Sequence, residues 1–349
     1  MSVGPARERT RNVREFEELQ YGMFIHFGLS TFTGIEIPRE PGLASEYQPT
    51  DLDVDQWIRV AAEAGMRYAV LTTKHCYGHC LWPSAVTDHV VTHDVVRGFA
   101  DACARYGLKA GFYYLLGWDA QHQPKMSPVE YEAFCRAQVA ELLTGYGPVR
   151  EMWFDIAWDM GPDTSRVLPR LYELVKSLQP DCLVMFTQSN NVMHGVADPF
   201  ALADATYFYE KTGARTRCWP SDITNAERRA PGRRHEPLMS VEGSVYYLPM
   251  EVCDTLTPNW FWVEGDPVRP LSELVELWER SVGCGANLLL DVPPDRSGQI
   301  PDEFVEPLME LRAAVGIYGA WTRAQAIHRL QFTPCNWGHA RLDVHSRRA

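Results

Sequence analysis

A single carboxylate stands inside an apolar, aromatic segment of the sequence. In EMWFDIAWD, residues 151–159, Asp155 has Trp153 and Phe154 on one side and Trp158 close by on the other. Strands favour aromatic and β-branched residues and avoid aspartate. Asp155 is therefore either a structural carboxylate with satisfied hydrogen bonds or a group that does chemistry, and it is the first candidate for a catalytic nucleophile.

Other polar side chains end short apolar segments elsewhere in the chain. Two carboxyl groups that face one cavity can divide their roles, one as nucleophile and one as acid/base, which is the minimum required for glycoside hydrolysis. The histidines could bind substrate, lie hydrogen-bonded in the core, or ligate a metal. These strand-end groups are His26, His75, Trp118 with Asp119, Glu210, Glu242 and Asp291.

Aromatic residues gather near the same strand ends. Large rings fill protein cores by default, but the C–H faces of sugars also stack on such rings, while sugar hydroxyls need partners such as histidine and carboxylate. Their clustering with polar groups favours a carbohydrate site. The aromatic residues concerned are Trp82, Tyr114, Trp153, Trp158, Trp260 and Trp262.

Short apolar segments alternate with longer segments of helical period, which is typical of repeated βα units. The pattern predicts a somewhat irregular (β/α)₈ TIM-type barrel, whose active site would lie at the C-terminal ends of the strands. The predicted strands are 21–28, 68–75, 109–118, 150–158, 182–188, 205–210, 237–243 and 286–294. The predicted helices are 52–65, 94–107, 127–147, 165–178, 272–283 and 301–316.

This reading divides the chain into three parts. Residues 1–20 form an N-terminal lead-in, residues 21–318 the catalytic barrel, and residues 319–349 a short C-terminal extension. The 349 residues are consistent with one large barrel, since barrels of this class exceed 200 residues as a single unit.

Composition excludes several classes of function. The net charge is −12 and no Lys/Arg run is longer than a pair, so nucleic acid is not an expected partner. A polar N-terminus and the lack of a long apolar stretch predict a cytoplasmic protein without membrane contact. Nine cysteines without a CxxC pair indicate reduced thiols and no structural zinc. We expect no cofactor and no metal, and a homo-oligomer is left open.

Several segments, taken together and in order, resemble the α-L-fucosidases of glycoside hydrolase family 29. The likeness runs from about residue 21 to 318. The segments are YGMFIHFGLSTFTG, YAVLTTKHCYGHCLWPSAVTDH, GLKAGFYYLLGWD, MWFDIAWD, PMEVCDTLTPNWFW and GANLLLDVPPDRSGQIP.

This resemblance implies a retaining exo-glycosidase that removes terminal L-fucose from glycans. It implies that Asp155 is the nucleophile. It also implies a substrate-binding set of His26, His75, Trp82, Tyr114, Trp153, Glu46 and Trp260.

The acid/base is left open among several glutamates. We expect Glu210, because it ends a predicted strand, while the resemblance also offers Glu251 in PMEVC. Glu242 and Glu227 are further alternatives.

The sequence also departs from the family. Cys76 and Tyr77 stand where the family has His and Asp, and His79 stands where it has Phe. The family's C-terminal β-sandwich is not expected in the residues that follow the last helix. A related galacto-configured or 6-deoxy sugar, and a carbohydrate-binding pseudoenzyme, are therefore kept as alternatives.

Overall fold

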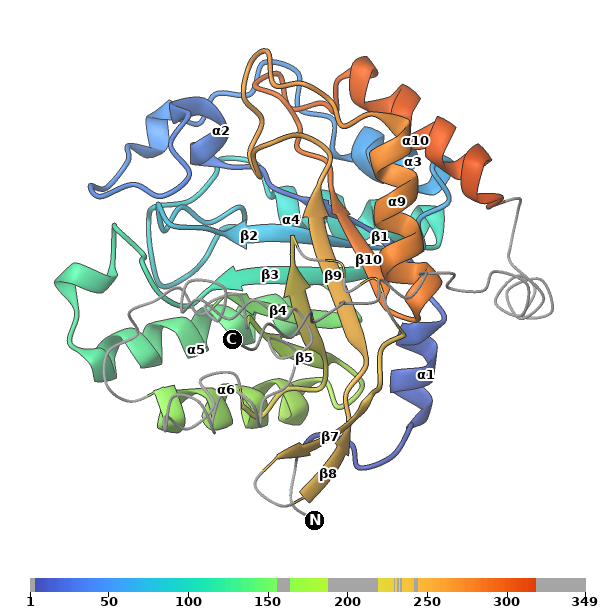
Figure 1. The fold of residues 1–349 in the computed structure, drawn as a ribbon. Coiled ribbons are helices and arrows are strands. Elements are labelled where there is room, and N and C mark those ends of the chain that lie inside the picture. Colours follow the sequence, from blue (N-terminus) through green and yellow to red (C-terminus); the bar gives the residue numbers. More distant parts are fainter. Residues whose placement is uncertain are drawn as a thin grey trace, which may run out of the picture.

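Eight parallel strands form the centre of the molecule (Figure 1). The computed structural model describes residues 4–155, 164–187, 219–228, 230, 232, 234–241 and 244–317. The strands of the sheet are β1 (Tyr21–Ile25), β2 (Tyr68–Lys74), β3 (Lys109–Leu115), β4 (Glu151–Asp155), β5 (Leu183–Phe186), β6 (Thr224–Glu227), β9 (Met250–Thr255) and β10 (Asn287–Asp291). Their order is β5-β4-β3-β2-β1-β10-β9-β6, which confirms the predicted barrel.

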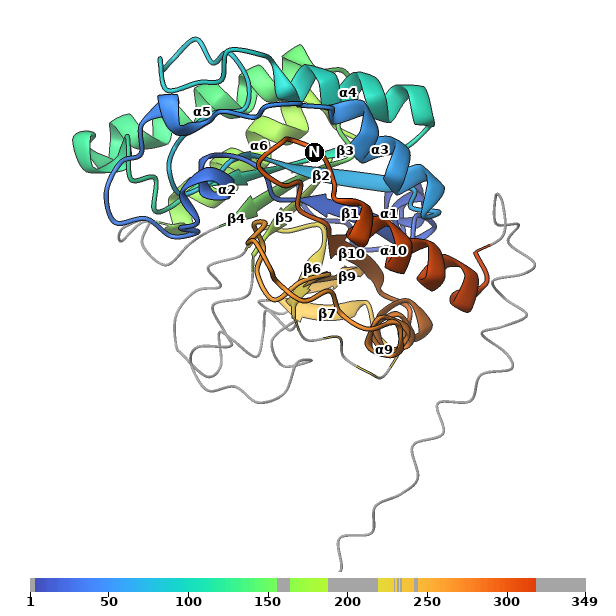
Figure 2. The same ribbon diagram turned by 90° about the horizontal axis from the view of Figure 1, so that it is seen from above.

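Helices cover the outside of the strands, and Figure 2 shows α3, α4, α5 and α6 along one side. Each of these long helices presents an apolar face to the strands, which is why the 3.6-residue period located them closely. The helices are α1 (Arg11–Glu17), α2 (Leu29–Thr33), α3 (Val54–Glu63), α4 (Val95–Tyr106), α5 (Pro128–Gly145), α6 (Thr164–Leu178), α9 (Leu271–Ser281) and α10 (Asp302–Val315). Short 3₁₀ turns are η1 (Ala44–Glu46), η2 (Gln123–Lys125) and η4 (Val282–Cys284).

The barrel closes between β5 and β6 through a backbone hydrogen bond and several side-chain bonds rather than through a strand ladder. The backbone N–H of Asp222, just before β6, donates to the Val184 carbonyl at 2.7 Å, and the Val184 N–H donates to the Asp222 carboxylate at 2.9 Å. Two α6 side chains, the Lys176 ammonium at 2.6 Å and the Tyr172 hydroxyl at 2.7 Å, bond the same carboxylate. Asp222 thus joins both edges of the sheet to a helix.

Helix α1 lies at the N-terminal ends of the strands. Its Val13 and Phe16, with Leu19, pack into the apolar cluster that fills the barrel interior. The Asn287 side chain of β10 also donates to the Phe16 carbonyl at 2.8 Å. Part of the segment predicted as a lead-in therefore contributes to the core.

The prediction of a seventh barrel strand at 237–243 was wrong. There β7 (Leu238–Val241) pairs antiparallel with β8 (Ser244–Tyr247) in a separate hairpin, which bonds to Ala6 near the N-terminus (Figure 1). The seventh barrel strand is β9. The sequence did not indicate β6 because its letters, TNAE, are mostly polar. The predicted strand at 205–210 lies outside the described residues.

Candidate active site

Asp155 is the last residue of β4 and faces the barrel mouth. The Tyr113 hydroxyl donates to its Oδ2 at 2.8 Å, and the Thr187 hydroxyl donates to its Oδ1 at 3.0 Å. Inward-facing residues alternate along β4, so Trp153 lies inward below Asp155. The carboxylate is partly buried and held by two hydroxyl donors from neighbouring strands. This geometry fixes the carboxylate at the place where barrel enzymes bind substrate.

His26 follows β1 and bonds to the end of β10. Its Nδ1 lies 2.7 Å from the Asp291 Oδ1, and both side chains are almost fully buried. Burial lowers the pKa of His26 to about 3 and raises the pKa of Asp291 well above its ordinary value. The contact is therefore a hydrogen bond to a neutral imidazole rather than an ion pair, and it fixes the orientation of the ring.

His75 follows β2 and lies beside His26, with ring centroids 6.0 Å apart. It stacks on Tyr113 at 5.7 Å with an interplanar angle of 23°. Burial, and then the neighbouring His26, lower the pKa of His75 to about 3. Its Nδ1 is buried and has no hydrogen-bond partner among the described residues. Two neutral imidazoles thus stand side by side, and neutral imidazoles suit sugar hydroxyls because they donate and accept hydrogen bonds.

Aromatic rings line the mouth around these polar groups. Trp153 stacks on Tyr113 with centroids 5.3 Å apart and an angle of 26°. Trp260 lies 5.0 Å from the His26 ring, and the Arg228 guanidinium lies 4.9 Å from the centre of Trp260. A carboxylate, two imidazoles and several ring faces in one place can bind and attack a sugar.

Four residues at this mouth were missed in the sequence, namely Tyr113, Thr187, Arg228 and Glu36. Tyr113 and Thr187 contact Asp155 directly, and Arg228 covers Trp260. Burial is the main cause that raises the pKa of Glu36, and His26, Arg228, Asp155 and Asp291 lie close enough to interact with it electrostatically. The adjacent tyrosines in KAGFYYLL gave a usable signal for Tyr113, but Glu36 and Arg228 lie in segments without a strand pattern.

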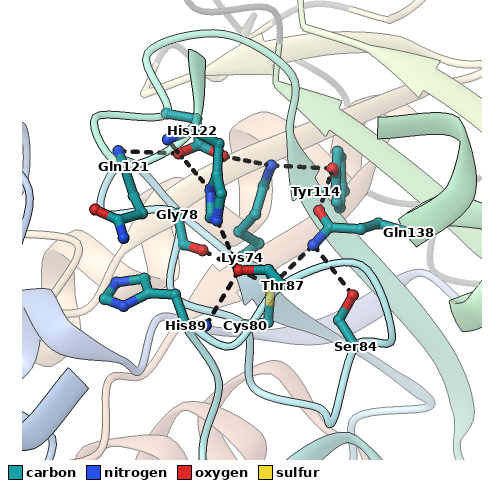
Figure 3. Close-up of polar contacts among 11 residues, drawn as sticks. Lys74, Gly78, Cys80, Ser84, Thr87, His89, Tyr114, Gln121, His122 and Gln138 are labelled. Atoms are coloured by element: carbon teal, nitrogen blue, oxygen red, sulfur yellow. Dashed lines mark hydrogen bonds and ion pairs between the residues drawn. The ribbon is translucent and has the colours of Figure 1, made fainter. Parts of the chain in front are cut away.

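The predicted place of Tyr114 in the pocket was wrong. Tyr114 is fully buried on the outer face of β3, where its hydroxyl accepts from the Lys74 ammonium at 2.9 Å and donates to Gln138 at 2.6 Å (Figure 3). Lys74 in turn pairs with Asp119 at 3.0 Å. Side chains alternate along a strand, so Tyr113 faces inward in its place.

Trp82 and Glu46 also lie away from Asp155, contrary to the prediction. Trp82 is buried in the outer core, and its indole N–H donates to the Glu141 carboxylate of α5 at 2.8 Å. Glu46 is exposed in η1, and its carboxylate accepts from the Leu43 N–H at 2.8 Å. Trp82 thus holds helix α5, and Glu46 caps the 3₁₀ turn η1.

Glu251 lies at the wrong level of the barrel for an acid/base. It is the second residue of β9, pairs in register with Asn287 at the start of β10, and is fully buried. Asp155 ends β4, four residues beyond Glu151, and four residues span about 13 Å along a strand. The Glu251 carboxylate accepts from the indole N–H of Trp153 at 3.0 Å, on the interior side of that ring. The C-terminal mouth does not include it.

Of the remaining acid/base candidates, Glu227 lies within the described residues and Glu210 and Glu242 do not. Glu227 ends β6 and pairs in register with Cys253, which faces the barrel interior. Glu210 and Glu242, and the aromatic candidate Trp158, lie outside the described residues.

The described residues offer no cluster of three or more His, Cys, Asp or Glu side chains that could hold a metal ion. The seven cysteines in this part of the chain are free and buried. None of the described helices combines the length and apolar character needed to cross a bilayer.

Comparison with known proteins adds independent observations. The sequence profile of the α-L-fucosidase family matches residues 41–320. α-L-Fucosidase 1 of Arabidopsis thaliana is 33% identical over 300 residues, which cover 82% of this chain and 56% of that protein. A glycoside hydrolase 29 family member from an unknown rumen bacterium superposes with a TM-score of 0.71 at 27% identity, covering 90% of this chain and 58% of that one.

A second solved structure gives the same result. α-L-Fucosidase isoenzyme 1 from Paenibacillus thiaminolyticus has a TM-score of 0.70 at 25% identity and covers 90% of this chain and 79% of its own. The chain thus spans little more than half the length of the Arabidopsis protein that it matches.

Proposed function

Because the chain belongs to the α-L-fucosidase family, glycoside hydrolase family 29, we propose that it removes terminal L-fucose from glycans with retention of configuration. The observation that carries this proposal is Asp155, held by Tyr113 and Thr187 at a mouth lined by neutral histidines and aromatic rings. Such a site offers a nucleophile, partners for hydroxyls and a surface for the apolar face of a sugar.

The mechanism proceeds through two displacements. An Asp155 oxygen attacks the anomeric carbon while a general acid gives its proton to the departing glycosidic oxygen, and a covalent glycosyl-enzyme forms. The residue that served as the general acid is now a carboxylate and takes a proton from water. That water attacks the anomeric carbon and releases Asp155. His26 and His75 are proposed to hold ring hydroxyls, with Trp153 and Trp260 beside the sugar.

Glu210 remains our proposed acid/base, on the grounds given by the sequence. Among the described residues Glu36 is the alternative with a specific observation in its favour. Burial raises its pKa, and a raised pKa keeps a carboxylic acid protonated for general acid catalysis.

The Asp155→Asn variant tests this function. Since a neutral amide cannot attack, hydrolysis of a nitrophenyl α-L-fucoside should fall by at least about 1,000-fold with an unchanged melting temperature. Added azide should yield the glycosyl azide of inverted configuration. Near-normal hydrolysis by Asp155→Asn would remove the assigned nucleophile.

Cys76 bears on the choice of sugar because it lies buried in the interior cluster, where burial, and then Asp155 and Glu36, raise the pKa of its thiol. A thiol is a weak hydrogen-bond partner for a hydroxyl. A panel of nitrophenyl glycosides decides between L-fucose and a related galacto-configured or 6-deoxy sugar. Calorimetric sugar binding without turnover on any of them would instead identify a binding protein. A cytoplasmic location is also a proposal, for which cell fractionation is the test.

A further inference from the structure

Two carboxyl groups face each other inside the barrel, below the candidate active site. Glu151 begins β4 and Glu251 lies near the start of β9, and their side chains are 1% and 0% exposed. The two carboxyl groups lie in the same layer of the barrel interior, because the indole N–H of Trp153, two residues beyond Glu151 on β4, donates to Glu251, and each carboxyl group acts on the pKa of the other. Two neighbouring buried carboxyl groups require an explanation, because two ionised carboxylates repel at short range.

The other contacts of the pair leave one donor missing. Glu251 accepts from the Tyr68 hydroxyl at 2.7 Å through Oε2 and from the Trp153 indole at 3.0 Å through Oε1. Both Glu151 oxygens are buried, and neither receives a hydrogen bond from an N–H or hydroxyl donor among the described residues. An ionised carboxylate only accepts hydrogen bonds, so a proton on one of the two carboxyl groups supplies the missing donor.

The surroundings give little compensation for two negative charges. Arg150 is the cation that lowers the pKa of Glu151, but its guanidinium pairs with Glu15 at 3.5 Å and bonds to the Asn12 carbonyl at the N-terminal end. The other groups that face the pair are neutral, namely Tyr68 of β2, Trp153 of β4, Cys182 before β5, Cys253 of β9 and Asn287 of β10. Burial raises the pKa of Glu251 to about 7 and that of Glu151 well above its ordinary value.

The pair is connected to Asp155 through two rings. The Trp153 indole donates downward to Glu251 and stacks on Tyr113, whose hydroxyl donates to Asp155. A ring is fixed in rotation as well as in position when its N–H is bonded and its face is stacked. The positions of Trp153 and Tyr113 beneath Asp155 therefore depend on a hydrogen bond to Glu251, in the N-terminal half of the barrel.

We propose that Glu151 and Glu251 share one proton at neutral pH, and that this protonated pair positions Trp153 and, through it, Tyr113 beneath Asp155. The positioning role rests on the proposed function, whereas the shared proton does not. Glu251 is accordingly a positioning residue, because it lies below Trp153 and away from the mouth.

The pH dependence of stability tests the shared proton. A carboxyl group whose pKa is raised in the folded state keeps a proton that the unfolded chain releases above about pH 4.3. Stability is full below that pH and declines as the pH rises toward the folded value of about 7 for Glu251. Glu151→Gln puts a permanent donor in place of the titrating group, so its melting temperature should decline about half as much as the wild type's between about pH 5 and about pH 8.

Glu132→Gln is the matched control, because Glu132 is 5% exposed but ion-paired with Arg166 at 2.7 Å. It should lower stability without flattening the pH dependence in this range. Infrared difference spectroscopy should show that Glu151→Gln weakens the protonated-carboxyl band near neutral pH, since Asp291 and Glu251 still contribute to it, and that Glu132→Gln leaves the band unchanged. A wild-type pH slope in Glu151→Gln together with an unchanged band would overturn the shared proton.

Kinetics test the positioning role separately. Glu251→Leu and Trp153→Phe each remove the indole–carboxyl bond, and each should lower kcat for an α-L-fucoside by about 10-fold with a smaller change in KM. Glu251→Gln keeps an acceptor and should retain most of kcat. If Glu251→Leu does not fold, Trp153→Phe tests the role with the pair intact, and an unchanged KM in that variant separates the lost hydrogen bond from a lost contact with the sugar.

The outcomes separate the two claims. Wild-type kcat in both Glu251→Leu and Trp153→Phe would refute the positioning role. A wild-type protein that leaves every α-L-fucoside intact would instead refute the proposed function, and the pH experiment would still decide whether the proton is shared.

Discussion

Adjacent side chains on one strand point to opposite faces, and for this reason Tyr113 and Tyr114 have different surroundings. Tyr113 bonds to Asp155 inside the barrel, while Tyr114 bonds to Lys74 and Gln138 outside it. The two tyrosines are identical in type and buried to the same extent, at 2% and 0% exposure. Tyr113 belongs to the candidate site and Tyr114 does not only because the first side chain points into the barrel and the second points out of it.

The two phenylalanine variants form a matched pair. Tyr113→Phe removes a hydrogen bond to a charged carboxylate, and such bonds contribute about 1.5–3 kcal/mol, so kcat/KM should fall by about 10- to 100-fold. Tyr114→Phe should leave kcat/KM within about 3-fold and cost about 1–3 kcal/mol of stability, because it leaves buried polar partners unsatisfied. Steady-state kinetics and chemical denaturation of both variants measure this. A large loss of kcat/KM in Tyr114→Phe and a small one in Tyr113→Phe would show that Tyr114, and not Tyr113, acts at the active site.

The acid/base can be identified from the leaving group. The alanine variant of the true acid should lose far more rate on glycosides with poor leaving groups than on activated aryl glycosides, since the latter need little protonation. Azide should then restore its rate with retained configuration. Glu210→Ala is expected to behave in this way, with Glu36→Ala, Glu227→Ala and Glu242→Ala measured beside it. Equal loss on both substrate types for Glu210→Ala would move the role to whichever variant shows the selective pattern.

At the scale of elements, a buried ion pair joins β2 to the loop after β3. Lys74 and Asp119 are both fully buried and 3.0 Å apart, and Asp119 also accepts from the His122 ring at 3.0 Å (Figure 3). Burial opposes the charge, but Lys74 and His122 hold the pKa of Asp119 below its usual range. Gly78 allows the close approach, since a Cβ there would lie 2.2 Å from the Asp119 carboxylate.

Breaking this pair should destabilise the fold more than removing both partners. Lys74→Met leaves Asp119 charged and buried without its cation, which costs about 3–5 kcal/mol. The double variant Lys74→Met/Asp119→Asn should recover part of that loss, because no uncompensated charge remains. Lys125→Met, at an exposed lysine of η2, is the control and should change stability little. Urea denaturation of the wild type, Lys74→Met, Asp119→Asn, the double variant and Lys125→Met measures this, and strict additivity of Lys74→Met and Asp119→Asn would contradict the coupling.

At the scale of the whole molecule, the barrel depends on one seam. β5 and β6 are the two ends of the strand order, and Asp222 bonds to the β5 backbone and to two side chains of α6. Every other neighbouring pair of strands is joined by a parallel ladder, with one register shift between β2 and β3. We therefore expect the loss of Asp222 to weaken the closure between β5 and β6, where Ser221 also bonds to the β5 backbone.

Asp222→Ala should lower the free energy of unfolding by about 3–5 kcal/mol, because it leaves Lys176 largely buried without its counter-charge. Asp181→Ala is the control: Asp181 lies on the surface near Arg11, and its loss should be small. Hydrogen exchange should show faster opening of Val184 and Phe186 in Asp222→Ala only. Wild-type exchange at these positions would show that the seam is held by other contacts.

The sequence by itself determined the architecture and the strand-end chemistry. Helical periods predicted 127–147 where α5 spans Pro128–Gly145, and the apolar segments around His26, His75 and Asp155 placed these three residues at strand ends. These features are local, because helix periodicity and the end of an apolar run can be read within a few residues.

Only the tertiary structure decided which face each side chain occupies and which segments close the barrel. Parallel strands are buried on both faces, so their sequences lose the alternation that would show Tyr113 as inward and Tyr114 as outward. The family resemblance offered Glu251 as an acid/base, yet its register with Asn287 places it in the lower half of the barrel. The polar letters of β6 form a strand because β9 supplies its hydrogen bonds, whereas the apolar β7 pairs only with β8. Register and pairing depend on residues distant in the chain, and no local pattern records them.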